Sequence, residues 1–132
     1  MKKLIFIVTI FVVLNMAVFS LGLSELESDI GRSIFSGYHA HFLAFFIMSL
    51  LLSLILTHKM VSMQEPFMFS FLYALLVAVL IEVLQMQLAY RSFSVYDIFA
   101  AIGGAGIYWL IGHHAAKNGF FKFWNNSIHK SL

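Results

Sequence analysis

The sequence contains no cysteine and a single proline, and only 11% of its residues are charged. The absence of cysteine excludes disulfide bonds, thiolate metal sites and cysteine nucleophiles from any account of function. The shortage of charge argues against a soluble domain, because globular chains average about 25% charged residues. The formal net charge of +2 is also too small to predict nucleic-acid binding.

Apolar residues are abundant instead, at 61% of the chain, against roughly 45–50% in globular proteins. A helix needs about 20 mainly apolar residues to cross the hydrocarbon core of a bilayer. Four segments meet this requirement, and Pro66 suits the first turn of the third, where its missing N–H does no harm. The sequence therefore predicts an all-α polytopic membrane protein, with one domain over residues 1–132 forming a bundle of four transmembrane helices. The predicted spans are residues 4–23, 40–57, 67–88 and 93–112.

Lysine and arginine are distributed unevenly around these spans. If the N-terminus is cytoplasmic, six of the eight lie on the inner side and two on the outer side. Inner loops carry the excess of positive charge, so both termini are predicted to be cytoplasmic in a multi-pass protein of the cytoplasmic (inner) membrane. Residues 113–132 would form an interfacial cytoplasmic tail. The inner residues are Lys2, Lys3, Lys59, Lys117, Lys122 and Lys130, and the outer ones are Arg32 and Arg91.

The first span has an alternative interpretation as a cleavable signal peptide. Lys2 and Lys3 precede an apolar run, and residues 18–20 make a passable cleavage site. The run is long for the apolar region of a signal peptide, which favours a retained first span.

Polar residues gather at one level of the predicted bundle. His41, Glu82 and Asp97 each lie near the outer end of a different span, Gln85 follows Glu82 by three residues, and Arg91 lies in the short outer loop. A charge at the bilayer centre costs roughly 2.5–3.5 kcal/mol, so the two carboxylates need partners. Arg91 can grip one carboxylate in a two-bonded fork, and His41 can serve the other carboxylate or a ligand.

Small residues accompany the two carboxylates on their helical faces. Such residues let helices approach closely in a bilayer, where lipid provides no hydrophobic drive for packing. We expect the third and fourth spans to pack along these faces, which would also suit an oligomer with the same or another chain. The faces are Ala74, Ala78 and Glu82 on the third span, and Asp97, Ala101 and Gly104 on the fourth.

Three motifs follow one another in the polar part of the chain. They are "HFLAFF" from His41, "EVLQ" from Glu82 and "RSFSVYD" from Arg91, with Gly104 after them. Their order and spacing, over about residues 38–112, resemble the VanZ-like membrane protein family. The namesake of that family is associated with resistance to the glycopeptide antibiotic teicoplanin, and no biochemical mechanism is established for it. The resemblance implies that the recurrent polar positions of the family correspond to His41, Glu82, Gln85, Arg91 and Asp97.

The chain departs from the family pattern at two places. Members often carry Asp-Lys just before the histidine region, where this chain has Gly37 and Tyr38. Members also often carry Asn four residues after the aspartate, where this chain has Ala101. A site that used those polar groups would be depleted here.

These residues predict a polar cluster on the outer side that binds a membrane lipid, a lipid-linked envelope precursor or a glycopeptide. Arg91 would hold an anionic group, His41, Glu82 and Gln85 would add hydrogen bonds, and Asp97 would orient Arg91. An alternative is a membrane enzyme that uses Glu82 and Asp97 as acid and base, although no motif for a defined reaction is present. A third is a small assembly subunit, in which the same residues only fasten the helices together.

No cofactor, metal or nucleic-acid partner is predicted. The sequence has no P-loop, no Rossmann glycine pattern and no nucleic-acid-binding module. His39 and His41 are two residues apart, so on a helix they point to different sides. A zinc set of His41, Glu82 and Asp97 stays open, without a ligand-spacing motif to support it.

Overall fold

The computed structural model describes residues 2–23, 38–57, 65–88 and 94–119, and no β-strand occurs within these ranges. They form four helices, α1 (Lys2–Leu23), α3 (Tyr38–Thr57), α4 (Glu65–Gln85) and α5 (Val95–Lys117). Each helix is long and apolar enough to cross a membrane. The predicted all-α bundle of four candidate membrane spans is therefore confirmed.

The helices match a bilayer in both length and surface. α3 has 20 residues, which at a rise of ~1.5 Å per residue spans about 30 Å, the thickness of the hydrocarbon core. Large apolar side chains remain exposed on all four helices, among them Phe6, Leu43, Leu76 and Phe99. In water, each of these exposed side chains would forgo the free energy that burial provides, about 25 cal/mol per Å² of apolar surface. Lipid removes that cost, so the exposed apolar surface fits a membrane-embedded bundle.

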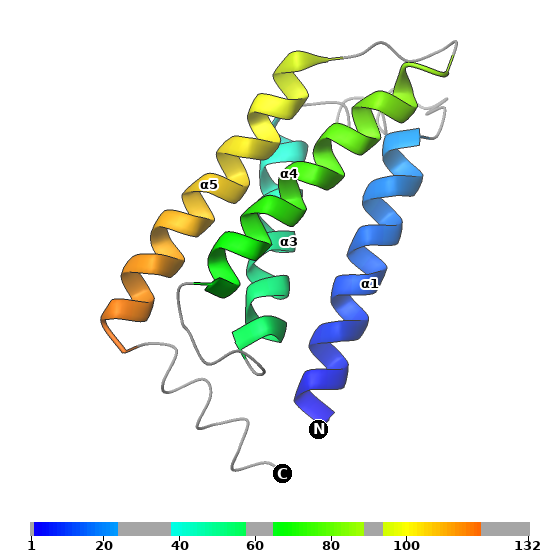
Figure 1. Cartoon of the computed structure of the whole chain (residues 1–132). Coiled ribbons are helices and arrows are strands. Elements are labelled where there is room, and N and C mark those ends of the chain that lie inside the picture. Colours follow the sequence, from blue (N-terminus) through cyan, green and yellow to red (C-terminus); the bar gives the residue numbers. More distant parts are fainter. Residues whose placement is uncertain (1, 24–37, 58–64, 89–93, 120–132) are drawn as a thin grey trace.

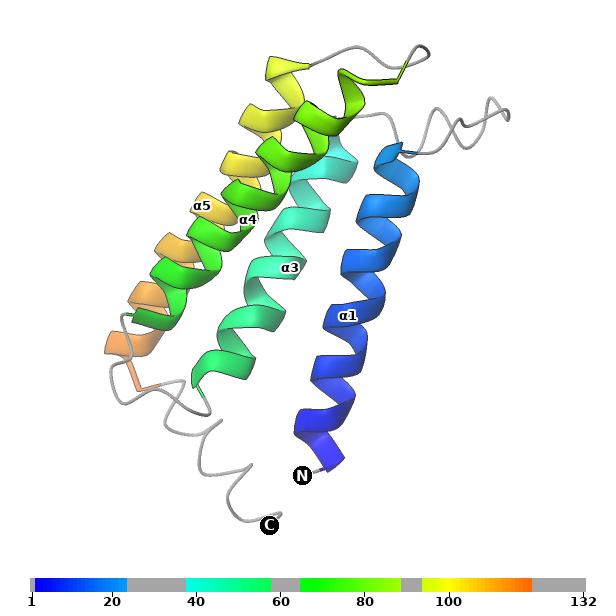
Figure 2. The ribbon, with the colours of Figure 1, turned by 45° about the vertical axis from the view of Figure 1, so that its right-hand side comes forward.

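Helices that follow one another in the chain run in opposite directions (Figures 1 and 2). α1 and α4 run one way, whereas α3 and α5 run the other way (Figure 1). α3, α4 and α5 all pack against one another, and α1 lies against α3 and, to a smaller extent, α4. The starts of α3 and α5 therefore meet the end of α4 at one end of the bundle, which we call the Asp97 end. The start of α1 and the end of α5 lie at the opposite end, which we call the Lys117 end.

Small side chains bring the three central helices together. Alanines from α4 and α5 lie in one buried cluster with larger residues of α3 and α4, as predicted for the small faces. Because alanine adds little bulk, the backbones approach closely and dispersion contacts replace the missing hydrophobic drive. The cluster consists of Phe45, Met48, Ala74, Val77, Ala78, Ile81, Ala101 and Ala105. A second cluster, nearer the Lys117 end, joins Phe67 to Tyr108.

Gly104 marks the closest approach between α3 and α5. A Cβ atom built on Gly104 would lie 2.1 Å from the carbonyl oxygen of Phe42, on the backbone of α3. The prediction that Gly104 belongs to the contact between the third and fourth spans is therefore wrong, since Gly104 faces the second span. The reason is that α5 packs against two helices, and α3 is the one that reaches its glycine.

Hydrogen bonds between side chains also join helices. The Tyr73 hydroxyl on α4 donates to Oδ1 of Asn15 on α1, at 2.7 Å. Ser53 on α3 and Tyr108 on α5 share a second hydrogen bond, and the Ser53 hydroxyl donates to the Leu50 carbonyl at 2.8 Å. Such bonds contribute about 0.6 kcal/mol each in membrane proteins. They fix which helix neighbours which more than they add stability.

Two helix ends differ from the predicted boundaries. α5 continues to Lys117 and does not end near residue 112, because Ala115 and Ala116 are strong helix formers and keep the polar end helical. The helix closes at Asn118, followed by Gly119 at φ 81, a conformation that favours glycine. α4 ends at Gln85, and residues 86 and 87 follow as a turn. The rest of the predicted tail, residues 120–132, lies outside the described residues.

Replacing Gly104 by alanine should destabilise the bundle, whereas the same change at Gly103 should not. The new Cβ at 104 would overlap the Phe42 backbone, and overpacking of this kind costs about 1–3 kcal/mol. At Gly103 the new Cβ would meet the Phe42 ring at 3.6 Å, an ordinary contact. The measurement is thermal unfolding of both variants in detergent. Equal midpoints for Gly104→Ala and Gly103→Ala would contradict the close approach.

Candidate functional site

The start of α5 is fixed by a serine cap. Ser94 has extended backbone angles (φ −123, ψ 105), and its side-chain oxygen accepts a hydrogen bond from the backbone N–H of Asp97 at 3.2 Å. A serine followed three residues later by an acid is typical of a capping box. In that arrangement the acid folds back and accepts the N–H of the serine. The local sequence alone would therefore turn the Asp97 carboxylate toward Ser94.

Glu82 of α4, and not Asp97, accepts the backbone N–H of Ser94. Its Oε2 accepts the backbone N–H of Ser94 at 2.8 Å, and the Glu82 residue is 2% exposed. A carboxylate beside the first turn of a helix is also favoured by the helix dipole. Glu82 thus ties the end of α4 to the start of α5 and does the capping that Asp97 would otherwise do.

Asp97 is therefore available to face α3. Its Oδ2 lies 3.9 Å from Nε2 of His41, and the side chains of His41 and Asp97 are 19% and 17% exposed. That separation is too long for a direct hydrogen bond, and a bridging water or ligand group suits such a gap. The His41 ring stacks on Phe45, with ring centroids 6.5 Å apart and an angle of 13° between the planes, which holds the imidazole in position.

The other carboxylate oxygen of Asp97 is unsatisfied. Oδ1 is buried and has no hydrogen-bond partner within the part of the chain that the structure describes. A buried polar atom without a partner costs about 1–3 kcal/mol, and more if charged. A donor from a ligand or water would remove that cost.

Of the five predicted site residues, four lie at the Asp97 end. Glu82 and Gln85 are buried on the same side of the last turns of α4, at 2% and 3% exposure. His41 and Asp97 are partly open. Arg91 lies outside the described residues. The cluster therefore has a buried half on α4 and an accessible half formed by α3 and α5.

Two tyrosines flank the accessible half, and sequence reasoning did not select them as site residues. The rings of Tyr38 on α3 and Tyr96 on α5 have centroids 6.0 Å apart at an angle of 55°, and the residues are 54% and 71% exposed. The sequence does contain a signal for them. Tyr38 precedes His41 by about one helical turn, and Tyr96 precedes Asp97 directly.

A row of buried hydroxyls runs along α3 away from this site, and it was also missed. Ser49, Ser53 and Thr57 are spaced by four residues and are each at most 3% exposed. Ser53 is bonded to Tyr108, and the Thr57 hydroxyl donates to the Ser53 carbonyl at 2.5 Å. The regular spacing in the sequence was the available signal, because it places the three side chains along one face.

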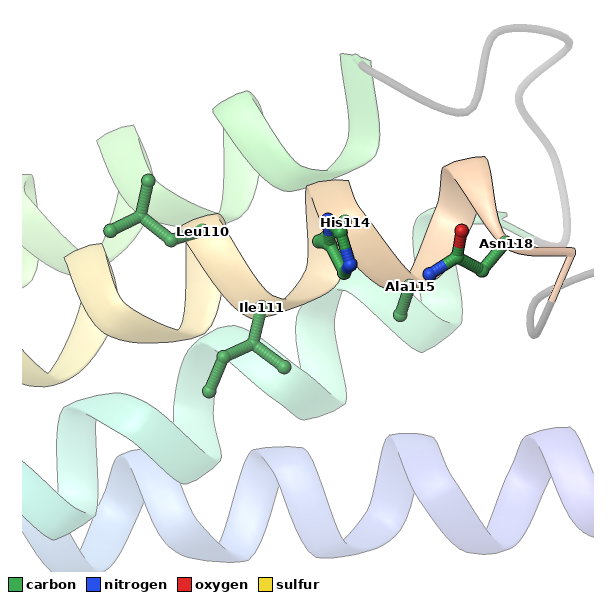
Figure 3. A pocket seen from close by; sticks show the side chains of 5 residues that line it. All are labelled: Leu110, Ile111, His114, Ala115 and Asn118. Atoms are coloured by element: carbon green, nitrogen blue, oxygen red, sulfur yellow. The ribbon is translucent and has the colours of Figure 1, made fainter.

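An open pocket lies toward the Lys117 end, away from the predicted site. Figure 3 shows its lining side chains, which come from α5 and from the Asn118 cap that follows it, and which are apolar except for one histidine and one asparagine. Within the described residues, no three His, Asp or Glu side chains are grouped so that they could hold a metal ion. The zinc set of His41, Glu82 and Asp97 is therefore not assembled. The pocket is lined by Leu110, Ile111, His114, Ala115 and Asn118.

Comparison with known proteins identifies no relative: no family model, no curated protein and no solved structure matches this chain. The resemblance to the VanZ-like family therefore stays a prediction from the motifs alone.

Replacing Glu82 by alanine should destabilise the protein more than replacing it by glutamine. Alanine leaves the Ser94 N–H without its acceptor, at a cost of about 1–3 kcal/mol, whereas the glutamine oxygen can still accept it. Unfolding in detergent measures both variants. If the two variants unfold alike, the bond to Ser94 contributes nothing measurable.

A double-mutant cycle with Asp97→Ala extends this test. Once Glu82 is gone, Asp97 can fold back onto Ser94 as in an ordinary capping box. The loss from Glu82→Ala should therefore be larger when Asp97 is also absent, with a coupling of at least ~0.5 kcal/mol. Strict additivity would contradict the exchange of partners.

Proposed function

We propose that this chain is a VanZ-like membrane protein of the cell envelope whose polar cluster binds an envelope lipid or lipid-linked precursor. In this proposal, that binding underlies resistance to teicoplanin-type glycopeptides. One observation carries the proposal. The Asp97 carboxylate faces His41 across a gap of 3.9 Å and keeps a buried oxygen without a partner in the described chain. If the protein's own residues satisfied this pair, His41 and Asp97 would be joined by a direct hydrogen bond.

The distribution of lysine supports a site on the extracytoplasmic side. Lys3 and Lys117 are described at the end of the bundle opposite Asp97. The inner side of a membrane protein carries the excess of lysine and arginine, so the Lys117 end is proposed to be cytoplasmic. Arg91 adds a cation to the loop between α4 and α5 in the sequence, suited to an anionic group of the ligand.

A second candidate is an assembly role without a ligand. It is favoured by the buried half of the cluster, since Glu82 is sealed from solvent and bonded to the start of α5. The enzyme alternative would need Glu82 to exchange protons with a substrate, and its burial leaves Asp97 as the accessible carboxylate. We therefore assign Glu82 a positioning role and the contact with the ligand to His41 and Asp97.

Expression in a glycopeptide-susceptible bacterium should raise survival in teicoplanin. His41→Ala and Asp97→Ala should abolish the gain, because each removes one side of the proposed contact. Lys117→Ala, which removes an exposed charge at the opposite end, is the matched control and should keep the gain. Membrane levels are compared by immunoblot.

Two outcomes would count against the proposal. Equal survival with and without the gene would contradict the resistance role. A full gain in the His41 and Asp97 variants, at equal membrane levels, would exclude the cluster from that role and favour the assembly candidate.

A further inference from the structure

We propose that the group received at the Asp97 end is the ammonium of a phospholipid headgroup, bound to the Asp97 carboxylate beside the rings of Tyr38 and Tyr96. This inference rests on the proposed function, because it names the chemistry of the ligand for the same site. It differs from the expectation drawn from the sequence, which began from Arg91 and an anion.

The charge of the accessible half favours a cation. Within the described residues, the Asp97 end carries two carboxylates, Glu82 and Asp97, and no lysine or arginine. Glu82 is sealed and accepts the N–H of Ser94, which leaves Asp97, with a side chain that is 17% exposed, as the accessible carboxylate. Oδ1 of Asp97 is buried and has no hydrogen-bond partner there, and Oδ2 lies 3.9 Å from His41, so the described residues do not satisfy the Asp97 carboxylate. An ammonium provides both the missing donor and the opposite charge.

The two tyrosines supply a surface for the same charge. Their rings come from different helices and meet at 6.0 Å, and both remain largely exposed. Aromatic faces attract ammonium groups within about 6 Å of the ring centroid, with Trp and Tyr the stronger binders. Tyrosines at a membrane interface are common in themselves. Here, however, the pair lies at the same helix starts as the His41–Asp97 pair, since Tyr96 directly precedes Asp97 and Tyr38 lies about one turn before His41, a combination suited to an ammonium.

The surroundings indicate a lipid as the source of the ammonium. Leu43 on α3 and Phe99 on α5 follow the site along their helices and are 56% and 64% exposed. A headgroup seated at Asp97 can therefore lay its acyl chains along exposed apolar side chains that already suit lipid. A free, water-soluble amine would gain the contacts with Asp97 and the rings but not this apolar contact.

Native mass spectrometry of the full chain in detergent tests the proposal. The protein is titrated with phosphatidylethanolamine, phosphatidylcholine and phosphatidylglycerol of identical acyl chains. Phosphatidylethanolamine, whose ammonium carries N–H donors, should be retained at least fivefold more than phosphatidylglycerol. Phosphatidylcholine carries the same charge without an N–H to donate, so it should be retained less than phosphatidylethanolamine and more than phosphatidylglycerol. Asp97→Asn keeps the shape of the side chain but removes its charge, and should weaken retention of phosphatidylethanolamine about tenfold.

Aromatic variants separate the ring contribution from a general effect. Tyr96→Leu and Tyr38→Leu should each weaken retention of phosphatidylethanolamine roughly two- to fivefold. Trp109→Leu is the matched control, since Trp109 is an exposed aromatic residue nearer the opposite end, and it should leave retention unchanged. Unfolding of each variant is followed in parallel, so that a folding defect is recognised.

The outcomes distinguish this inference from the proposed function. Preferred retention of phosphatidylglycerol, lost in His41→Ala, would overturn the ammonium assignment and leave a lipid-binding site at the Asp97 end. Lipid retention that no Asp97-end variant changes would overturn both. If soluble phosphoethanolamine competed as well as the lipid, the assignment of a lipid as the source of the ammonium would be overturned.

Discussion

The hydrogen bond from the Ser94 N–H to the Glu82 carboxylate is the interaction on which the polar end of the bundle depends. It joins the end of α4 to the first turn of α5, and it satisfies a backbone donor that lipid could not. Because Glu82 caps the helix, Asp97 does not fold back on its own serine. Its carboxylate can then face His41 on α3, which brings all three central helices into one site.

This arrangement divides the polar residues by role. Glu82 and Gln85 are buried and act on the geometry of the hairpin, whereas His41 and Asp97 keep part of their surface open. A fully buried and fully satisfied cluster would indicate only a structural role in holding the helices together. The proposed binding site rests instead on the open pair, in which no described residue satisfies one carboxylate oxygen.

Much of the fold could be predicted, because the apolar runs determine where the spans lie and the antiparallel topology brings distant polar residues to one end. The partners within that end could not. A carboxylate in a span indicates that a partner is needed. A backbone N–H such as that of Ser94 cannot be recognised as that partner from a pattern of side chains. Likewise, Gly104 signals a close approach without naming the approaching helix, which proved to be α3.

The contact between Gly104 and the Phe42 backbone has a consequence for the order of biosynthesis. α5 is the last of the four helices to emerge during translation, yet it supplies both the glycine that α3 packs against and the acid that faces His41. Until α5 is made, His41 on α3 lacks the carboxylate that faces it, and Glu82 on α4 lacks the N–H of Ser94. The polar cluster is therefore completed only when α5 packs against α3, and a chain interrupted before α5 would keep His41, Glu82 and Gln85 but lack Asp97.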